Sequence, residues 1–258
     1  MNYDLVICGV GGQGVLTIAW VIDHAAHEAG LHFKQSEVHG MAQRGGAVSA
    51  FVRLSDQPVA SDLIAKGCAS LVLSMEPMEA LRYAELLRPE GWIVSDVVPL
   101  ENDAYPPHEA LYRVLFSVPR LVVLDAMRLA TNAGTVKAQN MVVLGAAASQ
   151  LPLPMELLEA QVRSLFAPKG ERIVRANVNA FRIGAAASGF ANALLALGVP
   201  SSVLARVTAR INFEPQPVSQ ASVEAWAQRL LAADGTQMAM RLFEAGTPMP
   251  AEWRGDVP

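Results

Sequence analysis

Short apolar runs alternate with segments of helical periodicity along most of this chain. The apolar runs have the length of buried strands and lie at 5–8, 69–74, 92–97 and 120–125. Segments with the pattern of helices follow the first, second and fourth of these strands, at 15–29, 76–87 and 126–130. Apolar strands that alternate with helices are typical of a sheet covered on both faces. The pattern therefore predicts an α/β fold, with a Rossmann-like open, mostly parallel sheet and helices on both faces.

The expected second strand, 31–39, differs from the others because it is polar. A parallel strand that is covered on both faces is normally a continuous apolar run. We therefore expect this strand at an edge of the sheet or at a functional surface. The next strand, 47–54, alternates small or polar residues with apolar ones, which predicts one exposed face.

The second half of the chain is predicted to be largely helical. Helices are expected over 140–150, 155–166 and 177–197, and again near 202–211 and 223–233. The remaining residues are rich in Pro, Gly and Trp, which predicts an extended end. We therefore expect a domain over 1–190 and a C-terminal helical extension over 191–258. The extension is interpreted as an arm over a partner chain, and a self-packed appendage is the alternative.

Composition excludes several classes of protein. The 258 residues carry a net charge of −4 and have a pI near 5.7, which argues against nucleic-acid binding. No apolar run approaches the ~18 residues of a membrane span, and no secretory signal is recognised, so a cytoplasmic location is expected. The two cysteines, Cys8 and Cys68, cannot supply the four thiolates of an iron–sulfur cluster, and the histidines have no metal-binding spacing.

Glycines are concentrated between the first strand and the first helix. The spacing of Gly9, Gly11 and Gly14 matches GxGxxG, in the strand–turn–helix context in which this motif binds phosphate groups. The first-turn N–H groups of a helix have no partner inside the helix and can bind an anion. We expect cofactor contacts from Gly9, Gly11, Gly12, Gln13 and Gly14. Alternatively, these residues only form a tight turn.

Two further features follow this loop. Glu37 lies a little over 20 residues after Gly14, near the position of the acid that binds ribose in dinucleotide folds. It does not end an apolar strand, so a conventional NAD site is disfavoured. Arg44 precedes Gly45 and Gly46, and a guanidinium beside loop N–H groups suits a phosphate or carboxylate. The alternative is a flexible turn.

These two glycine-rich segments carry a family resemblance. The run at 9–14 and the run Ser-Glu-Val-His-Gly-Met-Ala-Gln-Arg-Gly-Gly at 36–46 resemble the gamma subunit or gamma domain of 2-oxoacid:ferredoxin oxidoreductases. Among these, the sequence is most similar to the gamma-type beta subunit of indolepyruvate ferredoxin oxidoreductases. The resemblance continues to about residue 190 and does not cover 190–258.

The resemblance implies oxidative decarboxylation of a 2-oxoacid, such as an aryl-pyruvate, to an acyl-CoA and carbon dioxide. Electrons would pass to ferredoxin or another acceptor. Thiamine diphosphate, magnesium and iron–sulfur clusters are expected on a large partner subunit, while this chain completes the assembly and helps to bind coenzyme A. No catalytic or metal-ligating residue is assigned to this chain. The expected cofactor-binding residues are those at 9–14 named above, with Arg44, Gly45 and Gly46, and the expected interface or substrate-side residues are Glu37, His39, Gln43 and Asn140.

Two other functions stay open at this point. The chain could be a nucleotide-binding regulatory or scaffold domain without its own chemistry. It could also be a stand-alone nucleotide-dependent oxidoreductase, although the missing acid after the second strand disfavours that interpretation. For Asn140, a packing role and a functional role are equally supported by the sequence.

Overall fold

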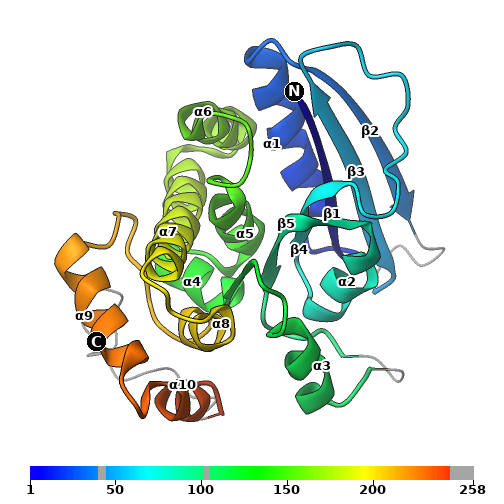
Figure 1. The fold of residues 1–258 in the computed structure, drawn as a ribbon. Helices are drawn as coiled ribbons and strands as arrows, with labels where there is room; N and C mark the ends of the chain where they lie inside the picture. The colour runs from blue at the N-terminus through cyan, green and yellow to red at the C-terminus, as the bar shows by residue number, and fades with distance from the viewer. Residues whose placement is uncertain (40–44, 102–104, 245–258) are drawn as a thin grey trace.

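The computed structural model describes residues 1–39, 45–101 and 105–244, and it contains one six-stranded sheet with helices around it (Figure 1). The strands are β1 (Asn2–Val10), β2 (His32–His39), β3 (Ala47–Ser55), β4 (Ala69–Ser74), β5 (Leu87–Asp96) and β6 (Leu121–Leu124). The helices are α1 (Val15–Glu28), α2 (Pro77–Arg82), α3 (His108–Leu115), α4 (Ala126–Ala133), α5 (Gln139–Ala147), α6 (Met155–Phe166), α7 (Glu171–Ala196), α8 (Ser201–Thr208), α9 (Gln220–Leu231) and α10 (Gly235–Glu244). None of the helices in these ranges is long and apolar enough to cross a bilayer.

The sheet has the strand order β2-β3-β1-β4-β5-β6, and the polar strand β2 is at its edge, as predicted. Strands β1, β4, β5 and β6 are parallel to one another. Strand β3 is antiparallel to both β1 and β2, so the sheet is mixed and mostly parallel. The antiparallel pair explains the polar pattern of β2, because antiparallel strands can leave one face to water.

Successive residues of β1 point to opposite faces of the sheet, and each face has its own core. Leu5 and Ile7 belong to the larger core, which includes buried residues of α1, α4, α5 and α7. Val6 and Cys8 belong to the smaller core, which includes residues of α2, α3 and α8. The prediction of helices on both faces is therefore confirmed, and Cys8 is a buried core residue.

Several predicted boundaries differ from the observed ones. The helix expected over 76–87 is shorter, because α2 ends at Arg82 and β5 already begins at Leu87. Helix α7 begins at Glu171, six residues before the expected start. Helix α10 was not predicted, since the glycine at its start and the Pro- and Gly-rich residues after it favoured an extended chain.

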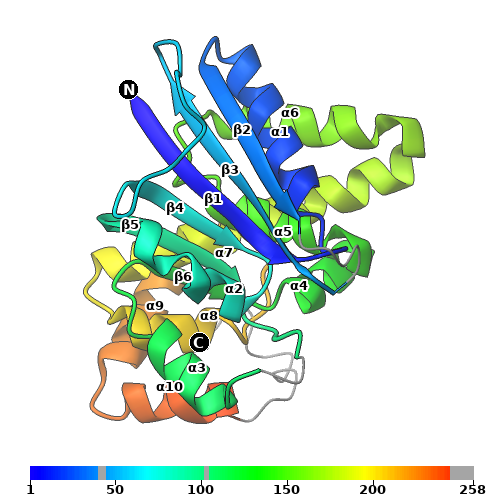
Figure 2. The same ribbon diagram turned by 90° about the vertical axis from the view of Figure 1, so that its right-hand side faces the viewer.

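The C-terminal helices pack against the rest of the chain at the end far from β2 (Figure 1, Figure 2). In α8, the Thr208 hydroxyl donates to the carbonyl of Val123 in β6 at 2.7 Å. In α9, Trp226 is fully buried, with its ring 6.0 Å from that of Phe190. The boundary that the sequence placed at residue 190 falls inside α7. The division into two domains stays a prediction. If it holds, the boundary between the domains runs through α7, and the contact of Thr208 with Val123 is one between the domains.

Candidate functional site

The glycine loop leaves the carboxyl end of β1 and enters α1 through a left-handed residue. Gly14 is the N-cap of α1, with φ of 85°, and Gly12 has φ of 100°. Both angles favour glycine because a side chain is strained in this region. Gly9 is required for space instead, since a Cβ there would lie 2.8 Å from the Cβ of Met75. The loop conformation therefore depends on glycine at each of these three positions.

Gln13 fastens the loop to the neighbouring strand end. Its Oε1 accepts from the N–H of Val10 at 2.7 Å, and its Nε2 donates to the carbonyl of Met75 at 2.9 Å. The side-chain amide thus bridges the end of β1 and the residue after β4. The structure gives Gln13 a role in shaping the loop, and its expected contact with a cofactor stays a prediction.

Asn140 lies directly against the loop from the start of α5. A Cβ on Gly14 would be only 2.5 Å from Asn140 Nδ2. Asn140 is buried, with only 7% of its surface exposed. Its Oδ1 has no hydrogen-bond partner among the described residues. Buried amide oxygens are normally hydrogen-bonded, so this atom is an unsatisfied acceptor at the candidate site.

A cavity of about 530 Å³ opens beside the loop and Asn140. Residues 12–14, Thr17, Lys137 and Lys169 are among those that line it. The N-cap provides no side-chain bond to α1, and the N–H groups of Val15 and Leu16 have no acceptor among the described residues, whereas the N–H of Thr17 donates to the carbonyl of Gly14 at 3.1 Å. Helix N-terminus, loop amides and two ammonium groups together favour an anion, and phosphate in particular.

Sequence reasoning missed both lysines. Lys137 lies three residues before Asn140, and that proximity is a signal that could have found it. Lys169 follows α6 and reaches the cavity only through the tertiary packing, with Nζ 5.1 Å from the Phe166 ring centroid. No local pattern indicates this position.

The second glycine segment meets the first. The N–H of Gly11 donates to the carbonyl of Gly46 at 2.8 Å, and Gly45 has a left-handed φ of 78°. The two glycine-rich segments that the sequence singled out are therefore neighbours in space. Gln43 and Arg44 lie outside the described residues.

Glu37 and His39 lie in the last part of β2, along the edge of the sheet. The backbone of His39 is paired with Val48, which is itself paired with Gly9, so β2 ends level with the loop. Burial, and to a smaller extent the negative charge of Glu37, raise the pKa of Asp23 in α1 to about 7. Asp23 is nine residues along α1 from Gly14, or about 13 Å at 1.5 Å per residue. Glu37 is thus associated with the middle of α1, away from its N-terminus.

Two buried carboxylates at the ends of β4 and β5 were also missed. Glu76 accepts from the N–H of Glu79 at 2.8 Å and from the Tyr105 hydroxyl. Asp96 accepts from the N–H of Ala126 at 3.3 Å, and burial raises its pKa to about 7. Both carboxylates order the segments that follow their strands. In the described ranges, no three His, Cys, Asp or Glu side chains are grouped to hold a metal ion.

Comparison with known proteins places this fold and loop in a family. The family model for pyruvate ferredoxin/flavodoxin oxidoreductase matches residues 4–187. The chain is 37% identical over 194 residues to the indolepyruvate oxidoreductase subunit IorB of Archaeoglobus fulgidus, covering 71% of this chain and 94% of that relative. The chain therefore belongs to the pyruvate ferredoxin/flavodoxin oxidoreductase family, as a subunit of a 2-oxoacid:ferredoxin oxidoreductase.

Solved structures agree on the fold. The gamma subunit of a keto/oxoacid ferredoxin oxidoreductase from Geobacter sulfurreducens matches with a TM-score of 0.52 at 23% identity, covering 70% of this chain and 95% of that one. A 2-oxoglutarate:ferredoxin oxidoreductase from Magnetococcus marinus, solved with 2-oxoglutarate, coenzyme A and succinyl-CoA bound, matches with a TM-score of 0.58 at 16% identity. That match covers 90% of this chain and 46% of the other. The predicted fold class is thus confirmed.

Proposed function

We propose that this chain is the gamma-type subunit of an enzyme that oxidatively decarboxylates an aryl-pyruvate, such as indolepyruvate, to an acyl-CoA and carbon dioxide. The support for an aryl-pyruvate is the 37% identity to a subunit named for indolepyruvate, over 94% of its length. In this proposal the electrons pass to ferredoxin or another acceptor through a complex in the cytoplasm.

We further propose that a larger partner subunit carries thiamine diphosphate, magnesium and the iron–sulfur clusters. The support is chemical. A cluster typically needs four thiolates, and this sequence contains only Cys8, which is buried in β1, and Cys68. The residues of this chain would then bind and orient a substrate without taking part in bond breaking.

The part of the reaction assigned to this chain is to hold the phosphate groups of coenzyme A beside the glycine loop. One observation carries this proposal: the loop amides, the α1 N-terminus, Lys137 and Lys169 surround a single cavity of about 530 Å³. The unsatisfied Oδ1 of Asn140 would accept a hydrogen bond from an N–H or O–H of the bound molecule. Arg44 is proposed to add a guanidinium to the same anion or to a carboxylate across the subunit boundary.

The test is the Michaelis constant for coenzyme A in the reconstituted complex. Lys137→Ala with Lys169→Ala should raise it at least about tenfold, the equivalent of 1.4 kcal/mol. The Michaelis constant for the 2-oxoacid should not change. Lys66→Ala is the control, since Lys66 is exposed and paired with Glu85 instead. A wild-type value for coenzyme A in the double variant would exclude this cavity as its binding site.

A nucleotide-binding regulatory or scaffold domain is the second candidate, because the cavity lined by the glycine loop, Lys137 and Lys169 would suit the phosphate groups of a nucleotide as well. Under this alternative the double lysine variant would alter assembly or regulation and leave the Michaelis constant for coenzyme A unchanged.

A further inference from the structure

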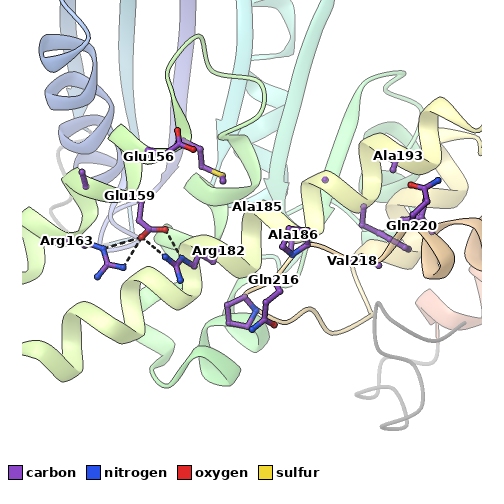
Figure 3. A pocket seen from close by; sticks show the side chains of 17 residues that line it. Glu156, Glu159, Arg163, Arg182, Ala185, Ala186, Ala193, Gln216, Val218 and Gln220 are labelled. Atoms are coloured by element: carbon purple, nitrogen blue, oxygen red, sulfur yellow. Dashed lines mark hydrogen bonds and ion pairs between the residues drawn. The ribbon is translucent and has the colours of Figure 1, made fainter.

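A second cavity, of about 680 Å³, lies between α6, α7 and the segment that leads into α9 (Figure 3). It shares no lining residue with the cavity beside the glycine loop. Its volume is within the range of about 300–1,000 Å³ that is typical of small-molecule sites. One wall is formed by residues 215–218, which lie beyond the residues 4–187 that the family model matches. We call it the α6–α7 groove.

The floor of the α6–α7 groove contains a glycine that the fold does not explain. Gly145 and Gly184 allow α5 and α7 to pack closely, since a Cβ at either would lie 1.9 Å from a carbonyl oxygen of the other helix. Gly189 is in the same helix α7, but a Cβ there would meet no atom within 4 Å outside its own helical neighbourhood. Glycine destabilises a helix interior relative to alanine. An external group that approaches α7 closely at Gly189 would account for it.

One end of the groove is charged. Glu159 accepts from Arg163 Nη2 at 2.9 Å and from Arg182 Nε at 2.7 Å. One carboxylate is thus shared by two guanidiniums, which hold its pKa below the usual range, and the cluster keeps one net positive charge. Neither Nη1 group has an acceptor among the described residues. Each is a planar donor suited to a carboxylate.

The rest of the lining is apolar or amide. Pro215, Pro217 and Val218 line the groove together with the amide side chains of Gln216 and Gln220. Glu156 also lines the groove, but Figure 3 shows it on the far side of Glu159 from both guanidiniums. A mostly apolar cavity with a few polar groups at one end fixes the orientation of an amphipathic ligand.

We propose that the α6–α7 groove binds a small monocarboxylate with a flat apolar body. The carboxylate accepts from Arg182 and Arg163, and the apolar body lies over Gly189 against the proline rings. This site is separate from the glycine loop, and the proposal does not depend on the function proposed above.

The test uses the full chain with phenylacetate as the probe and phenylacetamide as its uncharged analogue, with binding followed by titration in NMR spectra. Phenylacetate should bind at least about tenfold more tightly than phenylacetamide, which corresponds to 1.4 kcal/mol. Arg182→Gln should remove this difference. Arg175→Gln is the matched control, because Arg175 is exposed on the same helix and does not line the groove.

A steric variant tests the position of the ligand. Gly189→Leu fills the floor of the groove from an exposed position, so thermal unfolding should be unchanged or shifted upward while phenylacetate binding falls at least about tenfold. If phenylacetate does not bind to the wild-type chain, the proposal is overturned. That result is expected if a protein segment, and not a small molecule, occupies the groove. Equal affinity for the two probes, or wild-type affinity in Gly189→Leu, would overturn it as well.

Discussion

Asn140 holds its side-chain amide against Gly14, so close that a Cβ on Gly14 would be 2.5 Å from Nδ2. This contact joins the start of α5 to the start of α1 and forms one side of the cavity proposed for coenzyme A. The two residues are 126 positions apart in the sequence, and they depend on one another for space.

Gly14→Ala should destabilise the chain for two separable reasons. The left-handed φ of 85° costs about 1–2 kcal/mol for a side chain, and the contact with Asn140 adds to this. Asn140→Ala should relieve only the second part. A double-mutant cycle by urea unfolding should therefore give a favourable coupling of about 0.5 kcal/mol or more. If the changes in unfolding free energy of the two single variants add up to that of the double variant, the contact between Gly14→Ala and Asn140 carries no strain.

Gln13→Ala should destabilise the loop by removing both bonds of the bridge. The N–H of Val10 and the carbonyl of Met75 would lose their partners, at about 1–3 kcal/mol for buried groups. Gln228→Ala, at an exposed position of α9, is the control and should have little effect. Equal unfolding midpoints for the two variants would show that the bridge is dispensable.

Asp23 should contribute stability that is lost as pH rises from about 4 through 7. Burial and then Glu37 raise its pKa to about 7 in the folded state, against about 3.9 in an unfolded chain. Between these two pKa values the folded state keeps a proton that the unfolded state has lost. The stability that this proton provides is lost as pH rises through the folded-state pKa of about 7.

Asp23→Asn should accordingly stabilise the chain at pH 8, by about 1–3 kcal/mol, and have little effect near pH 4. Glu90→Gln is the control, because Glu90 is exposed at the start of β5. Unfolding free energies that differ from wild type by the same amount at both pH values would contradict the assignment.

Trp226→Ala should show whether the C-terminal helices belong to the folded core. Trp226 is fully buried against Phe190, so its truncation should cost about 3–5 kcal/mol. Leu231→Ala, exposed on the same helix, should cost less than about 0.5 kcal/mol. If Trp226→Ala leaves the unfolding of the chain unchanged, residues 191–258 form an arm that unfolds independently, in line with the domain division expected from the sequence.

Patterns within single segments predicted much of the fold. Helix α6 has the bounds expected from its periodicity, Met155–Phe166, and the polarity of β2 placed it at an edge. The antiparallel direction of β3 was not predicted, although the alternation of small or polar with apolar residues in this strand is typical of an antiparallel strand with one exposed face.

The candidate site was predicted only in its local part. The glycine loop is recognisable from the spacing of its glycines. The sequence singled out the second glycine-rich segment as well, and Gly46 of that segment bonds to the loop. Asn140 was expected at the site from the family resemblance, whereas Lys169 lies in a 3₁₀ turn after α6 that tertiary packing brings to the loop, so no local pattern indicates it. The bridge made by Gln13 was also hidden, since it depends on where β4 ends.

The most direct test of the account is dye reduction by the purified chain, first alone and then with the large subunit from the same host. We predict a colourless protein that reduces no dye with indolepyruvate and coenzyme A, because its two cysteines cannot supply the four thiolates of an iron–sulfur cluster. With the partner present, reduction should require both the 2-oxoacid and coenzyme A, and the clusters should give the mixture a brown spectrum. Substrate-dependent dye reduction by the chain alone would contradict the assignment of the redox cofactors to a partner.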